Sequence, residues 1–230
     1  MASKIIRISP SILAIDYNNK EVLKQALTDI EKAGASMVHL DVMDGVFVKN
    51  KTFDHKLVDE IKDMTSLMLD VHLMVANPEK VIDDYIKAGA DILTVHYEAC
   101  KNVEETLKYI KSKNVVTGLA INPKTSILKI KDLLASGLID VVTVMGVNPG
   151  ACGQAFIPGS AEKVAELRDI DRKVFIEIDG GVNVKNSAIL RKMGVNIIVS
   201  GSTIFSSKNM KKTINQLKGK GFFSKLKKHF

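Results

Sequence analysis

Two histidines and two aspartates stand inside otherwise apolar segments of this 230-residue chain. His39 and Asp41 belong to "MVHLDVMDG", His72 to "LDVHLMV", and Asp179 to "VFIEIDGG". Burying such groups without partners is costly, so they must be satisfied by a metal ion or by tight hydrogen bonds. The alternative is four separate core residues or strand-end caps. Imidazole and carboxylate ligands suit a divalent transition ion such as Zn²⁺, Fe²⁺, Mn²⁺ or Co²⁺. The pattern predicts a metal site.

The two aspartates also predict acid–base chemistry. If Asp41 and Asp179 come from opposite sides of a barrel, they could flank a flat substrate on its two faces. A carboxylate is a weak base toward a proton next to a ketone, and a metal bound across the ketone and hydroxyl oxygens would stabilise the resulting enediolate. Proton removal on one face and delivery on the other is an epimerisation.

Three glycine-rich segments follow the last three apolar runs. They read "NPGACG" (148–153), "DGGVN" (179–183) and "SGSTIF" (200–205). Glycine lets backbone N–H groups approach phosphate oxygens closely, and such loops beside a helix N-terminus form the usual phosphate site of α/β barrels. Any one of them could be a tight turn, but together they predict phosphate binding.

Further residues near these segments have two interpretations each. Met43, Met74 and Met145 could form an apolar collar around the site or could be ordinary core residues. Ser11 could contact substrate or cap its strand, and we favour substrate contact. Cys152 lacks a neighbouring base and is not expected to be a nucleophile. His55, His96 and His229 have no partner spacing and are interpreted as structural or surface residues.

Short β-branched runs alternate with amphipathic helical segments throughout the chain. The strands are expected at residues 5–13, 37–43, 67–75, 91–97, 115–121, 141–147, 173–179 and 196–200. Residues 19–35 and 78–91 are typical of the intervening helices, with a glycine near each end. Eight such units predict a single-domain (β/α)₈ TIM barrel of the phosphate-binding type over residues 1–218. The unusual polar residues lie late in their strands, where such barrels carry chemistry.

Composition narrows the class of protein. The chain has no apolar run long enough for a membrane span and no secretory leader pattern at its N-terminus, and Cys100 and Cys152 form no disulfide framework. We therefore expect a cytoplasmic protein. The net charge of +7 arises from residues 208–230, which hold eight lysines and no acid. We expect a basic tail at 219–230 with no nucleic-acid role; contact with an anionic membrane is the less favoured alternative.

The chain resembles the ribulose-phosphate 3-epimerase family, which acts in carbohydrate metabolism, in the pentose phosphate pathway. The resemblance rests on "ISPSILA", "VHLDVMDGVFVKNKTF", "LDVHLMV", "VNPGACGQAFIP", "EIDGGVN" and "VSGS". The match as a whole extends from residue 8 to the end of "VSGSTIF" at residue 205. It implies a metal-dependent isomerase that inverts C3 of D-ribulose 5-phosphate to give D-xylulose 5-phosphate. It also implies a homo-oligomer, because family members are commonly dimers or larger.

The resemblance also implies roles for individual residues. His39, Asp41, His72 and Asp179 would bind the metal, with Asp41 and Asp179 as the acid–base pair. Ser11 and His72 would contact the sugar. The remaining substrate and phosphate contacts would come from Gly150, Ala151, Cys152, Gly153, Gly180, Gly181, Gly201 and Ser202.

Departures from the family pattern keep two alternatives open. The loop after the second strand reads "FVKNKTFDH", and the phosphate loop reads "PGACGQ" where "PGFGGQ" is usual. Both loops would touch or cover substrate, so a hexulose 6-phosphate such as D-allulose 6-phosphate is an alternative substrate. The lysine-rich tail raises a non-enzyme alternative, a barrel scaffold that acts through that tail.

Overall fold

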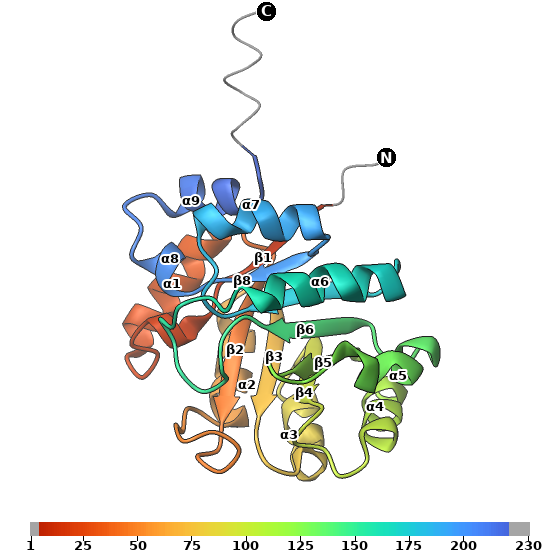
Figure 1. Ribbon diagram of the computed structural model, residues 1–230. Helices are drawn as coiled ribbons and strands as arrows, with labels where there is room; N and C mark the ends of the chain where they lie inside the picture. The colour runs from red at the N-terminus through yellow and green to blue at the C-terminus, as the bar shows by residue number, and fades with distance from the viewer. Residues whose placement is uncertain (1–4, 221–230) are drawn as a thin grey trace, which may run out of the picture.

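The protein, seen in a computed structural model that describes residues 5–220, is a parallel barrel wrapped by helices (Figure 1). Its strands are β1 (Arg7–Ser9), β2 (Met37–Met43), β3 (Met68–Met74), β4 (Ile92–His96), β5 (Val116–Ile121), β6 (Val141–Met145), β7 (Phe175–Asp179) and β8 (Ile197–Val199). The helices are α1 (Lys20–Lys32), α2 (His55–Met64), α3 (Ile82–Lys87), α4 (Val103–Ser112), α5 (Lys131–Ala135), α6 (Gly159–Ile170), α7 (Val184–Met193), α8 (Ser202–Phe205) and α9 (Met210–Leu217). Short 3₁₀ turns are η1 (Ile12–Ala14), η2 (Pro78–Lys80) and η3 (Ile127–Ile130).

The sheet closes on itself. Its parallel strands run in the order β1-β8-β7-β6-β5-β4-β3-β2. A bridge between Ser11 and His39 then joins the end of the first strand to the second, where the His39 N–H donates to the Pro10 carbonyl at 2.9 Å. The predicted single-domain (β/α)₈ barrel is confirmed.

Most elements are a few residues shorter than the sequence pattern predicts, and two differ from it more strongly. The first strand ends at Ser9 because Pro10 has no N–H to donate to a ladder, and Ser11 instead caps η1. The helical segment at 78–91 divides into η2 and α3, because Val81 (φ −123°, ψ −6°) leaves helical geometry between them. The predicted glycine stops are present: Gly34 and Gly89 both adopt φ +90°, which favours glycine.

Apolar side chains fill the space between the sheet and the helices, and a second, smaller apolar layer plugs the inside of the barrel. That plug consists of Met37, Ile92, Val141 and Ile197. Above it the inward-facing residues become polar, because residues two apart on a strand face the same side. The strand register then places His39 beside Asp70, Asp41 beside His72, and Met43 beside Met74. The polar centre therefore sits on a closed apolar floor.

The predicted tail at 219–230 lies almost wholly outside the described residues, as does His229, so the domain boundary and the role of the tail stay predictions. Among residues 5–220, no helix combines the length and the apolar character that crossing a membrane requires.

Candidate active site and metal centre

Three strand ends bring the four predicted ligands together inside the barrel. His39 Nε2 lies 3.3 Å from Asp41 Oδ1 and 3.8 Å from Asp179 Oδ2. His72 Nδ1 lies 3.4 Å from Asp41 Oδ1 and 3.5 Å from Asp179 Oδ2. One donor atom from each residue lies within 4.8 Å of all the others, and all four residues are buried. The cluster is able to hold a metal ion.

The donor atoms fit such an ion in spacing and in chemistry. Zinc-type bonds of about 2.0–2.2 Å in a tetrahedron put neighbouring donors about 3.3–3.6 Å apart, which is the range of most of these distances. His39 Nε2 and His72 Nδ1 are buried without a hydrogen-bond partner. Leaving a buried nitrogen without a partner costs free energy. A cation placed among these atoms would give both nitrogens a partner.

Charges within the cluster shift the pKa values of its aspartate and histidine members in opposite directions. Burial disfavours the charged form of Asp41, yet His39 and His72 lower the pKa of this carboxyl well below its usual range. Burial likewise opposes protonation of the two imidazoles, but the aspartates around them raise the pKa of His39 and of His72. Asp41 is therefore a carboxylate, and a positive charge in the space between these groups is stabilised.

A second polar layer, which the sequence reasoning did not assign, lies below His39. The His39 Nδ1–H donates to Asp70 Oδ2 at 2.8 Å, and the Ser9 hydroxyl donates to the same oxygen at 2.8 Å. Burial and the charge of Asp70 raise the pKa of Glu177 well above its usual range. Glu177 Oε2 and Asp70 Oδ1 have no other partner, so a proton on Glu177 donated to Asp70 satisfies both. The period-two alternation from Asp70 to His72 and from Glu177 to Asp179 was the available signal.

His96 is a further residue whose role in the site the sequence reasoning missed. Interpreted there as structural or surface, it is fully buried and lies against a predicted metal ligand, with its Nε2 2.8 Å from His72 Nε2. Burial lowers the pKa of His96 to about 4, although Glu98 opposes this shift. His55, by contrast, lies away from the site and packs edge-on against Tyr85 at 6.1 Å.

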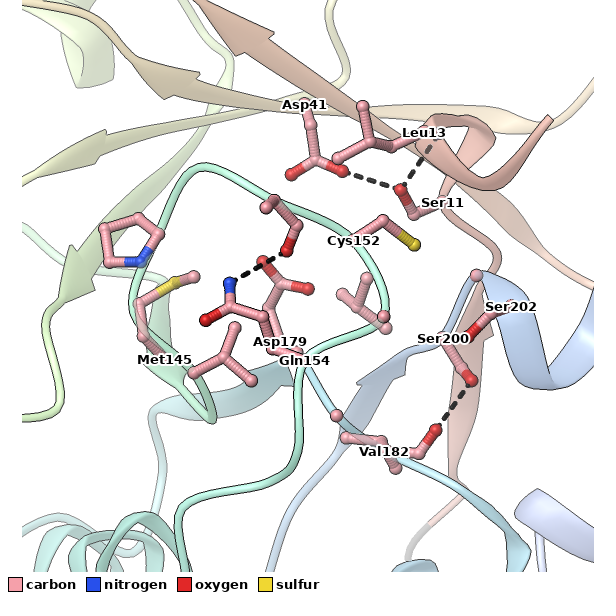
Figure 2. Close-up of a pocket in the computed structure, with 18 of the residues that line it drawn as sticks. Ser11, Leu13, Asp41, Met145, Cys152, Gln154, Asp179, Val182, Ser200 and Ser202 are labelled. Carbon is pink, nitrogen blue, oxygen red and sulfur yellow. Dashed lines mark hydrogen bonds between the residues drawn. The ribbon is translucent and has the colours of Figure 1, made fainter. Parts of the chain in front are cut away.

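The predicted phosphate loops and the two aspartates line one pocket (Figure 2). Figure 2 shows Asp41 and Asp179 facing this space from different strands, with Cys152 and Ser202 on its wall. The predicted phosphate-loop residues on the pocket wall are Gly150, Ala151, Cys152, Gly153, Gly180, Gly181, Gly201 and Ser202. The loop at Gly181 (φ +68°) packs so tightly that a Cβ there would lie 2.6 Å from the Phe156 nitrogen. Only glycine fits this turn.

Ser11 and the three methionines complete the wall of this pocket. The Ser11 hydroxyl donates to Asp41 Oδ2 at 2.6 Å and accepts the Leu13 N–H at 3.3 Å. Ser11 is thus both the N-cap of η1 and a contact of the predicted acid–base residue. Met43, Met74 and Met145 are almost fully buried and all line the pocket. His39 and His72 are not among the lining residues, but they cluster with Asp41 and Asp179, which are, so all the predicted site residues lie together.

Solved structures with low sequence identity share the architecture. A 3-hexulose-6-phosphate synthase (15% identity, TM-score 0.67) covers 94% of this chain and 99% of its own. KGPDC from Streptococcus mutans (14% identity, TM-score 0.70) covers 94% and 97%. At these identities the likeness concerns the fold alone.

Curated relatives are much closer in sequence. The ribulose-phosphate 3-epimerase of Bacillus subtilis is 39% identical over 220 residues, which cover 94% of this chain and 99% of the relative. That of Rhodobacter capsulatus is 41% identical over 202 residues (87% and 86%), and the chloroplastic ribulose-5-phosphate-3-epimerase of Arabidopsis thaliana is 38% identical over 219 residues (93% and 76%). The model of the ribulose-phosphate 3 epimerase family matches residues 7–205. The chain is therefore an enzyme of the isomerase class and belongs to the ribulose-phosphate 3-epimerase family.

Proposed function

We propose that this enzyme inverts C3 of D-ribulose 5-phosphate to give D-xylulose 5-phosphate. The observation that carries the proposal is the pair of carboxylates, Asp41 and Asp179, which border one pocket and cluster with two partnerless imidazole nitrogens buried behind its wall. The names of the relatives favour ribulose phosphate as the substrate.

The two aspartates act as base and acid on opposite faces of the sugar. One takes the C3 proton from one face of the sugar to leave an enediolate, and the other returns a proton to the opposite face. Asp41 is held ready as a carboxylate by the Ser11 hydroxyl and the neighbouring imidazoles. Ser11 would contact the sugar, and the collar of Met43, Met74 and Met145 would exclude water from the reacting carbon. His72, which is fully buried and is not among the pocket-lining residues, would act on the sugar through the ion rather than by direct contact.

His39, Asp41, His72 and Asp179 would hold one divalent ion, Zn²⁺, Fe²⁺, Mn²⁺ or Co²⁺. When bound, such an ion supplies Lewis-acid stabilisation of the negative charge that develops on the ketone oxygen. Because the Nδ1–H of His39 donates to Asp70, the Nε2 lone pair would be free to bind such an ion.

The phosphate group would sit among the glycine-rich ends of the last three strands. Gly181 approaches the neighbouring loop too closely for any other residue, and Gly201 precedes α8 at the same pocket. Backbone N–H groups in such loops favour an anion.

The experiment is proton NMR of the enzyme in D₂O with D-ribulose 5-phosphate and, separately, D-allulose 6-phosphate, each with and without chelator. We expect chelator-sensitive loss of the C3 proton signal and appearance of the 3-epimer, with the pentulose faster. A hexulose 6-phosphate remains the alternative because the small side chain of Ala151 lines the pocket. If neither sugar exchanges after metal is supplied, the proposed function is wrong.

A further inference from the structure

Glu98 and His96 form a relay that ends on His72. The ring planes of His72 and His96 differ by only 20°, and their centroids are 4.9 Å apart. That separation exceeds the 2.8 Å between the two Nε2 atoms by about two ring radii, so the rings meet edge to edge rather than face to face. One N–H···N hydrogen bond therefore joins them close to the plane of both rings.

The protonation pattern along this relay follows from the metal site. If His72 binds an ion through Nδ1, its neutral ring must carry its hydrogen on Nε2. That N–H donates to His96 Nε2, which must then be an acceptor. His96 carries its own hydrogen on Nδ1, 3.4 Å from Glu98 Oε2. The carboxylate of Glu98 is the only group in this series that accepts without donating.

Glu98 is itself held from the far side, where its Oε1 accepts the Asn122 N–H at 2.9 Å and the Thr125 hydroxyl. The amine of Lys163, on α6, donates to the Asn122 carbonyl at 3.0 Å and so steadies this loop. On the other flank of the relay the Phe47 ring packs against His96 with centroids 4.8 Å apart. His96 is fully buried, so water cannot replace the carboxylate.

We propose that Glu98 and His96 are positioning residues that fix the metal-binding tautomer of His72. This inference rests on the proposed metal site and adds two residues that act through His72 without touching substrate. A carboxylate, that of Asp70, fixes the tautomer of His39 by a direct hydrogen bond. The tautomer of His72 is fixed through a second imidazole, that of His96. Such supporting contacts typically change metal affinity by about 10–100-fold.

The substitution Glu98→Gln tests the relay with almost no change in shape. Asn122 and Thr125 both donate to Oε1, so they select the amide oxygen and turn the amide nitrogen toward His96 Nδ1. Two donors then face each other, and His96 must move its hydrogen to Nε2, opposite the N–H of His72. We expect metal affinity to fall about tenfold or more.

The measurement is competition between the metal-stripped enzyme and a chromophoric chelator for Zn²⁺. The control is Asp140→Asn, because Asp140 also holds a backbone N–H, that of Thr117, but lies before β6 at the far end of the barrel. We expect this control to bind within about twofold of the original enzyme. If the original enzyme takes up none of Zn²⁺, Mn²⁺, Fe²⁺ and Co²⁺ in this assay, the proposed metal site is wrong, and the relay with it. If it binds Zn²⁺ and Glu98→Gln binds it equally well, the relay alone is wrong.

A second measurement observes the tautomers directly in the original enzyme and does not depend on a variant with reduced metal affinity. Long-range ¹H–¹⁵N spectra of the Zn²⁺-loaded enzyme, labelled at histidine, report which ring nitrogen carries hydrogen, and His96→Gln assigns the His96 signals by their loss. We expect hydrogen on Nδ1 of His96 and on Nε2 of His72. Hydrogen on Nε2 of His96 in the original enzyme would overturn the inference.

Discussion

Replacing Asp41 by asparagine should slow epimerisation by orders of magnitude while leaving proton exchange on one face of C3 intact. The amide keeps the volume of the carboxylate and an oxygen that can accept the 2.6 Å hydrogen bond from Ser11. It cannot carry a proton between substrate and solvent. Asp179 still faces the pocket, so the face of C3 that it serves keeps its base.

The magnitude follows from losing one of two proton carriers. A positioned acid–base group contributes about 10²–10⁴ in rate, or about 2.7–5.4 kcal/mol of activation free energy. We expect kcat for epimerisation to fall by that factor in Asp41→Asn and in Asp179→Asn. Exchange of the C3 proton should survive in one epimer only, and in opposite epimers for the two variants.

The assay follows deuterium incorporation by NMR, starting from each epimer in turn, at a metal concentration that saturates the variant. Saturation matters because both aspartates also belong to the metal cluster. Bound metal is measured in parallel, so loss of the ion is not mistaken for loss of a base. The two-base scheme is refuted if both variants exchange the same epimer, or if either epimerises at nearly the original rate.

Three other perturbations test separate parts of the structure. Binding of the metal should stabilise the fold by about 4 kcal/mol at a thousandfold excess over Kd, and a chelator should therefore lower Tm by about 8–16 °C in calorimetry. Backbone N–H groups lower the pKa of Asp44 despite partial burial, so its contribution is present above an unfolded pKa near 3.9 and is lost as pH falls through the folded value. Asp44→Asn should accordingly cost about 1 kcal/mol in urea denaturation at pH 7, and this gap should narrow at pH 3. Alkylation of Cys152, on the pocket wall, should abolish activity, and should be slow at pH 7 and faster at pH 9 because burial raises the pKa of its thiol.

Each of these has its own control. Metal should return Tm to its starting value, and no change on chelation would mean that no ion binds the fold. An Asp44→Asn gap that stays constant between pH 7 and pH 3 would contradict the role of the ionised carboxylate. For alkylation, Cys152→Ser should be resistant and substrate should protect, whereas inactivation of that variant would point to Cys100, whose pKa burial raises to about 12.

The sequence by itself determined the architecture and the identity of the chemical groups. Period-two alternation placed His39, Asp41 and Met43 on one face of a strand, and repeated strand–helix units indicated the barrel. Because parallel strands in a barrel all end on one side, residues late in separate strands were expected to meet, and the structure brings them into one cluster. Local rules also anticipated the helix stops at Gly34 and Gly89.

Only the tertiary structure decided which groups support that cluster. Alternation puts Asp70 and Glu177 on the same strand face as His72 and Asp179, but neither it nor the spacing around His96 shows which groups these residues contact. Their partners are set by the strand register and by the curvature of the closed sheet, which places His96 of β4 against His72 of β3 and Glu98 beside the loop after β5. Hydrogen bonds between neighbouring strands depend on distances of a few tenths of an ångström, and no one-dimensional pattern encodes them.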